Sequence, residues 1–109
     1  MQNSGHYTVT LTTGAQRLSD ATGATFTPDD GKAPVKWVSL QSDAAATGAA
    51  YVGFYGCVLS TTNYAGLIPA PVTAIPSAPS IIEGGITSLD QIVVLGTAGE
   101  KIHVGFLRD

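Results

Sequence analysis

The residues best suited to chemistry are Cys57 and two histidines, His6 and His103. A thiolate with a neighbouring imidazole is a pairing used for nucleophilic catalysis. No family-type signature surrounds Cys57, and "YGCVL" is typical of a strand in which a small thiol packs as an apolar side chain. His103 alternates with Ile102 and Val104, which favours an exposed or interface imidazole on the opposite face of a strand. The sequence therefore predicts that the protein is not an enzyme.

Acidic residues raise two further possibilities, a calcium site and a pair of catalytic carboxylates. Asp29 and Asp30 are adjacent and precede Gly31, whereas a calcium loop spaces its ligands at alternate positions, so this run indicates a turn. The other carboxylates lie in or beside predicted turns, where charges are normally solvated: Glu83, Asp90 and Glu100. No cysteine and histidine cluster has zinc spacing, and "GTAGEK" lacks the spacing of a phosphate-binding loop. We expect no metal and no cofactor.

The charge content excludes several classes of partner. The chain has 109 residues, five Lys or Arg, a formal net charge of -3 and only 12% charged residues. Without a basic stripe, direct binding to nucleic acid or to an anionic membrane surface is not expected. The N-terminus lacks the pattern of a secretory signal, and one cysteine fits synthesis in a reducing cytoplasm. The low charge indicates a surface that is rich in small polar residues or covered by a partner.

The elements that must position these residues are short strands. "HYTVTLTT" alternates apolar and polar residues, and "PVKWVSLQS" is a second clear strand. Further strands are expected around Phe26 and over 49–59, 63–71, 80–85, 90–97 and 100–108. The 49–59 strand is either continuous or broken near Gly56, and a helical turn is expected at 87–91, capped by Thr87 or Ser88. About eight strands without crossover helices predict an all-β domain covering 1–109, an antiparallel β-sandwich resembling a jelly roll, with a small barrel as the alternative.

A short internal repeat of four residues occurs in two of these strands: "YVGF" at 51–54 is similar to "HVGF" at 103–106. Either the match is chance, or Gly53 and Gly105 let a neighbouring backbone or ring approach. We expect a core that includes these residues and the tryptophan: Trp37, Val52, Phe54, Val104 and Phe106.

A proline-rich segment at 69–79, "PAPVTAIPSAP", holds four of the six prolines. Prolines cannot sit inside a sheet, so the segment is expected to be extended. "PSAP" also matches a short recognition peptide, although such peptides normally lie in disordered tails. Apolar residues accompany the prolines, two just before the segment (Leu67 and Ile68) and two within it (Val72 and Ile75), whereas a solvated linker would be rich in polar residues. Two interpretations stay open. The segment is an extended arm that packs against a neighbouring subunit or the capsid, or it packs only against its own domain.

From residue 35 onward the chain resembles small virion proteins of tailed bacteriophages. The resemblance rests on "WVSLQSDAAATGAAYVGFYGCVLSTTNYAGLIPAP" and "SLDQIVVLGTAGEKIHVGFL", in which strands alternate with Gly-rich and Ser/Thr-rich turns and a Gly-Leu-x-Pro edge. The long proline segment departs from the shorter turn expected in that group. The resemblance implies a head decoration (cement) protein or a fibre domain, and it implies no catalytic residue.

These observations lead to a non-enzymatic capsid decoration protein, made in the host cytoplasm and located on the capsid surface of the virion. Its expected partners are the major capsid protein and itself, as a homo-oligomer that is most simply a trimer at a three-fold site. The residues expected at this interface are Tyr64, Leu67, Ile68, Pro69, Pro71, Val72, Ile75 and Pro76. The alternative is a receptor- or carbohydrate-binding module that would use an exposed aromatic platform: Tyr51, Tyr55 and Tyr64.

Overall fold

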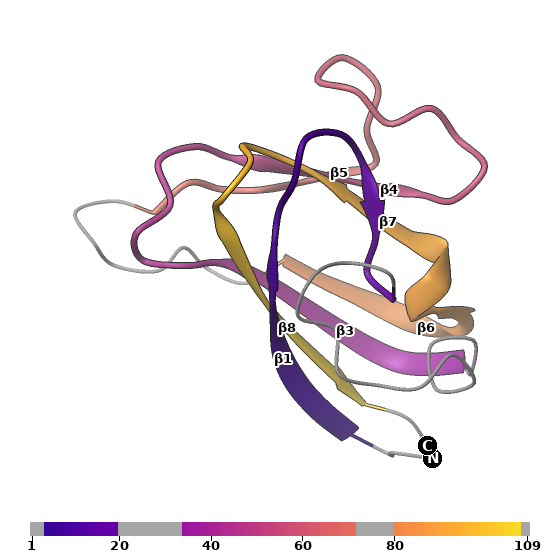
Figure 1. Ribbon diagram of the computed structural model, residues 1–109. Helices are drawn as coiled ribbons and strands as arrows, with labels where there is room; N and C mark the ends of the chain where they lie inside the picture. Colours follow the sequence, from indigo (N-terminus) through magenta and orange to yellow (C-terminus); the bar gives the residue numbers. More distant parts are fainter. Residues whose placement is uncertain (1–3, 20–33, 72–79, 108–109) are drawn as a thin grey trace.

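The computed structural model describes residues 4–19, 34–71 and 80–107, which form two packed β-sheets (Figure 1). The strands are β1 (Ser4–Thr10), β2 (Gln16–Arg17), β3 (Pro34–Ser42), β4 (Ala50–Phe54), β5 (Gly66–Ile68), β6 (Ser80–Ser88), β7 (Ile92–Leu95) and β8 (Lys101–Leu107). One 3-10 turn, η1 (Leu89–Gln91), joins β6 to β7. Ser88 occupies its N-cap position, but the Ser88 side chain makes no capping hydrogen bond to the turn backbone. The strand expected around Phe26 lies outside the described residues.

The two sheets have the strand orders β1-β8-β3-β6 and β2-β7-β4-β5. The pairs β1–β8, β2–β7, β3–β6 and β4–β5 are nested inside one another, as if one long antiparallel hairpin had been rolled up. This is the strand order of a jelly roll, two four-stranded sheets packed face to face. The predicted all-β sandwich is confirmed.

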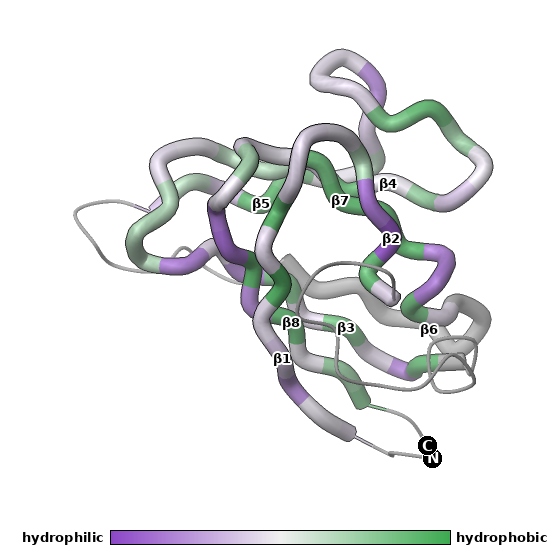
Figure 2. Tube along the Cα trace, in the orientation of Figure 1, coloured by the Kyte–Doolittle hydropathy of each residue, from purple (hydrophilic) through white to green (hydrophobic). Residues whose placement is uncertain are grey.

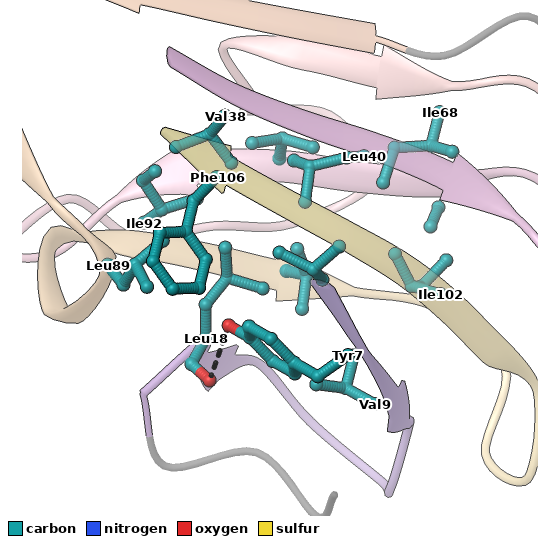
Figure 3. Packing of buried hydrophobic residues seen from close by; sticks show 14 of the residues in the cluster. Tyr7, Val9, Leu18, Val38, Leu40, Ile68, Leu89, Ile92, Ile102 and Phe106 are labelled. Atoms are coloured by element: carbon teal, nitrogen blue, oxygen red, sulfur yellow. Dashed lines mark hydrogen bonds between the residues drawn. The ribbon is translucent and has the colours of Figure 1, made fainter. Parts of the chain in front are cut away.

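The core lies between the sheets because the strands alternate in hydropathy. In β1, Tyr7 and Val9 are buried, and their partners across the strand pair, Val104 and Ile102, are buried with them. The Tyr7 and Phe106 rings meet edge to face, with centroids 6.4 Å apart (Figure 3). The buried cluster draws on both sheets: Tyr7, Val9, Leu11, Leu18, Val35, Val38, Leu40, Ala50, Val52, Ile68, Leu89, Ile92, Val94, Ile102, Val104 and Phe106.

The core prediction was right for Val52, Val104 and Phe106 and wrong for Phe54 and Trp37. The Phe54 side chain is 42% exposed, because β4 ends at this residue. Trp37 is half-buried and sits beside Val38, a core residue, so it lies on the outer face of the first sheet.

The two glycines of the four-residue repeat differ in how closely a neighbour approaches. A Cβ on Gly53 would lie 3.0 Å from Leu59, which is too close without a shift, whereas a Cβ on Gly105 would lie 3.7 Å from the Trp37 ring, an ordinary contact distance. The interpretation that glycine permits a close approach is therefore supported at Gly53 alone.

A long loop at 55–65 follows β4, so the segment 49–59 is not one continuous strand but is broken after Phe54, close to the alternative break at Gly56. Gly56 has φ 94°, a backbone conformation that glycine adopts without strain and other residues rarely do. The Cys57 amide donates to the Phe54 carbonyl at 3.2 Å, which closes a tight turn at this point. Cys57 is consequently exposed in a loop and not packed within a strand.

Within the described ranges, no helix is long and apolar enough to span a membrane.

Candidate binding surface

Large exposed apolar side chains gather in one stretch of the chain. Of the six in the described residues, Leu107 lies at the end of β8, and the other five lie within 54–67: Phe54, Tyr55, Val58, Tyr64 and Leu67. Figure 2 shows the hydrophobic colour returning within the long loop that extends beyond β4. Val58 is 79% exposed, an unusual environment for a valine. Such a concentration on one surface is typical of an interaction site.

The 55–65 loop is fixed to the sheet at both ends. The Tyr55 amide donates to the Gln91 carbonyl at 2.8 Å, and the Ala65 amide donates to the Val52 carbonyl at 2.8 Å. Between them, Leu59 packs against Gly53 on the outer face of β4, where any larger residue would crowd it.

The tip of the loop is closed by its own polar groups. The Ser60 amide donates to the Asn63 carbonyl at 2.9 Å, and the Asn63 side-chain amide donates to the Val58 carbonyl at 2.6 Å. These bonds satisfy backbone groups locally. The loop therefore presents Val58 from an internally braced structure.

Tyr51, Tyr64 and Leu67 come together on the outer face of β4 and β5. Tyr51 is the cross-strand partner of Leu67, which places both side chains on the same face of the sheet. The Tyr51 and Tyr64 rings are tilted at 56° with centroids 4.9 Å apart. The structure thus brings together Tyr64 and Leu67, both expected at an interface, and Tyr51 and Tyr64, two of the three residues expected in an aromatic platform.

An open groove of about 630 Å³ runs between the 55–65 loop and β2 and β7. Its main side chains are Arg17, Tyr55, Val58, Leu59 and Val93. The Arg17 guanidinium lies over the Tyr55 ring, 4.4 Å from its centroid, a cation–π arrangement.

We call the combined region the aromatic surface, and it carries very little charge. It comprises Arg17, Tyr51, Phe54, Tyr55, Val58, Tyr64 and Leu67. Residues 54–67 contain no Asp, Glu, Lys or Arg, so Arg17 supplies the only charged side chain of this set. Aromatic rings combined with an arginine and little other charge are the composition of protein interface cores.

Six of the eight residues expected at an interface fall into three groups. Tyr64 and Leu67 are exposed in the aromatic surface, whereas Ile68 is fully buried between the sheets and was wrongly expected at an interface. Ile68 is buried because successive strand residues face opposite sides and Leu67 takes the outer side. Val72, Ile75 and Pro76, with the rest of the "PSAP" motif, lie outside the described residues.

The start of the proline-rich segment is attached to its own domain. The buried Ser42 hydroxyl donates to the Pro69 carbonyl at 2.9 Å. Pro69 is exposed and Pro71 is half-buried. The described part, up to Pro71, therefore leaves the sheet beside the end of β3.

Cys57 and His103 do not form a nucleophile and base pair. His103 Nδ1 lies 2.9 Å from the Thr8 hydroxyl, and His103 Nε2 lies 2.8 Å from Asp43 Oδ1, so both ring nitrogens are engaged on the first sheet. The hydrogen bond to His103, together with a weaker one from the Ala45 amide, lowers the pKa of Asp43 below its ordinary value. This row links β1, β8 and the end of β3 across an outer face.

Of the three carboxylates expected in or beside turns, Glu100 and Asp90 have local structural partners, whereas the turn expectation was wrong for Glu83, which lies within β6 opposite Trp37. Glu100 accepts from the Thr47 amide at 2.6 Å and from the Thr47 hydroxyl at 3.0 Å, which ties two turns together. Asp90 accepts from the Ser88 hydroxyl at the start of η1. The described residues contain no group of three His, Cys, Asp or Glu side chains that could hold a metal ion. Asp29 and Asp30 lie outside them.

Sequence reasoning missed Arg17, Phe54, Val58 and the groove as parts of the surface. The available signal was the 55–65 segment, which is apolar and uncharged but too rich in Ser, Thr, Asn and Gly for a strand.

The comparisons with known proteins add no identification: no family model, no curated protein and no solved structure matches this chain.

Proposed function

We propose that this chain is a structural virion protein that decorates a phage capsid, binding the major capsid protein through the aromatic surface. The proposal joins the sequence resemblance to one observation, the gathering of exposed aromatic and aliphatic side chains on the outer face of β4 and β5 and the adjoining loop. A decoration protein needs adhesion and a stable scaffold, and it needs no reactive group.

The geometry suits protein binding in three respects. The rings of Tyr51 and Tyr64 already contact each other, so little side-chain freedom remains to be lost when a partner covers them. The loop is anchored at both ends by backbone hydrogen bonds. The near absence of charge removes the cost of desolvating ionic groups, and tyrosine and arginine are the residues that most often dominate binding energy.

A matched pair of leucine substitutions tests the proposal. Leu67 is 43% exposed in the aromatic surface, and Leu107 is 44% exposed at the end of β8. Leu67→Ser and Leu107→Ser therefore make the same chemical change at equal exposure. Co-sedimentation with heads of the encoding phage stripped of this protein should fall at least tenfold for Leu67→Ser and stay near the parent level for Leu107→Ser.

Equal retention of both variants on the heads would refute the aromatic surface as the attachment site. Absence of the protein from purified virions, examined by electron microscopy and by protein mass spectrometry, would refute the decoration function altogether. We propose in addition that the protein acts as a homo-oligomer, and the copy number on each head would be counted in the same images.

Carbohydrate binding is a second candidate, favoured by the groove beside Tyr55. Sugar rings stack on aromatic faces, and an arginine can orient hydroxyl groups by donating hydrogen bonds. Arg17 and Tyr55 supply both groups at one open groove. Binding on a glycan array that Tyr55→Ala abolishes and Leu107→Ser preserves would favour this function. No glycan signal for the parent protein at millimolar ligand would eliminate it.

A further inference from the structure

The two sheets have four outer edges, and three of them are built in ways that discourage pairing with another strand. β2 has two residues and β5 has three, and Pro69 follows β5 directly. β6 has nine residues, but its register against β3 shifts between Val35 and Trp37. Short strands, nearby prolines and irregular register are the usual means by which proteins protect sheet edges.

The fourth edge, β1, has none of these features. It contains seven residues, "SGHYTVT", without proline, lysine or any acidic residue. Its pairing with β8 is regular from Ser4 opposite Leu107 to Thr10 opposite Lys101, with no shift in register. In the described part of the chain it is the outermost strand of its sheet. A long, regular and uncharged edge is a template for another strand.

The hydrogen-bond pattern shows which residues of β1 offer backbone groups at this edge. Leu11, which continues the strand, donates its amide to the Glu100 carbonyl at 2.8 Å and accepts from the Gly99 amide at 2.8 Å. Because antiparallel strands alternate between bonded and non-bonded pairs, the odd-numbered residues of β1 bond toward β8. The even-numbered residues direct their N–H and C=O groups away from β8: Ser4, His6, Thr8 and Thr10.

We infer that β1 pairs with β1 of a second copy of this chain, in antiparallel register about a two-fold axis at Tyr7. This register sets His6 opposite Thr8 of the other copy and Ser4 opposite Thr10 of the other copy. It uses the whole length of the strand, and each N–H directed away from β8 then donates to a C=O of the other copy, while each C=O accepts from an N–H of that copy.

β1 is complementary to itself in this register, which favours a second copy of the chain as the partner strand. Opposed residues in this register share a face of the joined sheet, and the outer-face pairs join small polar side chains with the His6 imidazole. On the inner face Val9 would lie opposite Gly5, a large residue beside a small one. No pair opposes two like charges, since β1 contains no Asp, Glu, Lys or Arg.

The contact goes beyond the proposed function and is independent of it. β1 belongs to one sheet, and the aromatic surface lies mainly on the other, so pairing would leave that surface accessible. The symmetry is two-fold, so the contact gives a dimer, and the trimer expected from the sequence would need a different interface.

Two substitutions at one position test the edge. His6→Pro removes an amide that points away from β8, a change that edge strands tolerate, and His6→Ser is the control that keeps the amide. Sedimentation equilibrium should give a mass of two chains for the parent and for His6→Ser, and a mass of one chain for His6→Pro. A monomeric parent at hundreds of micromolar, or a dimeric His6→Pro variant, would overturn the inference.

Cross-linking tests the register without disturbing the backbone. All chains would carry Cys57→Ser, because the native thiol is exposed. A mixture of His6→Cys and Thr8→Cys chains should form a mixed disulfide dimer on mild oxidation, because opposed residues lie about 5.5 Å apart between Cα atoms. A mixture of His6→Cys and Ser4→Cys chains is the control and should yield far less. Equal yields from the two mixtures would overturn the proposed pairing.

Discussion

Two phenylalanines in related strand segments provide a sharp test of the packing. Phe106 and Phe54 close the two copies of the "VGF" pattern, yet Phe106 is 3% exposed and Phe54 is 42% exposed. Phe106→Ala removes a ring that is enclosed by both sheets. The lost burial is worth about 2–3 kcal/mol, and the edge-to-face contact with Tyr7 adds about 1 kcal/mol. With the cavity that remains, unfolding should become easier by about 3–5 kcal/mol.

Phe54→Ala is the matched control, since it makes the same change at the end of a strand. Slightly more than half of the Phe54 side chain is covered, and water can fill the space that the ring leaves. The expected cost is therefore about 1 kcal/mol. For a domain of this size, that corresponds to a fall in melting temperature of roughly 4–8 °C.

Urea unfolding followed by tryptophan fluorescence would measure both costs, with circular dichroism as a second probe. If Phe106→Ala does not fold, Phe106→Leu should still fold and should cost more than Phe54→Leu. Equal costs for the two positions, in either series, would show that the face of β4 or β8 has been assigned wrongly.

Three further predictions follow from single contacts. The Asp43 pKa is lowered from 3.8, mainly by the His103 hydrogen bond. The stabilisation that the ionised Asp43 carboxylate contributes to the folded state is therefore present above pH 3.8 and is lost as the pH falls through the folded-state pKa. The difference in melting temperature between the parent and Asp43→Asn should shrink over that range. Ser42→Ala removes the donor to the Pro69 carbonyl and should cost about 1–3 kcal/mol in urea unfolding, a value that a result near zero would contradict. Burial raises the pKa of Tyr7, so absorbance at high pH should show this tyrosine ionising only as the protein unfolds, and its ionisation in step with the exposed tyrosines would contradict the burial.

Most of the architecture was readable from hydropathy alternation. "PVKWVSLQS" coincides with β3, and the turn at 87–91 contains η1, because alternation and a cap residue are local properties of the sequence. β2 was missed because a two-residue strand cannot show a period. The sequence left open whether the 49–59 strand breaks near Gly56, because apolar residues look the same in a strand and in a loop that packs back on the sheet.

The candidate surface was only partly predictable, because a surface is defined by contacts between distant segments. Tyr51 and Tyr64 were identified as aromatic candidates, but their stacking depends on how the loop returns to β5. Arg17 is remote from Tyr55 in sequence, and nothing local indicates that their side chains meet. Ile68 and its neighbour Leu67 face opposite ways, which the apolar run "LIP" does not reveal.

The nesting of the strands brings the two ends of the described chain together, since Ser4 lies opposite Leu107 (Figure 1). A short linker could therefore join the existing ends while new ends are opened elsewhere, giving a circular permutant. The same proximity would let the whole domain be inserted into a surface loop of an unrelated carrier protein. The two points of attachment in that loop need be no further apart than two neighbouring strands of a hairpin. The 55–65 loop would then point away from the carrier as a site for displaying foreign peptides.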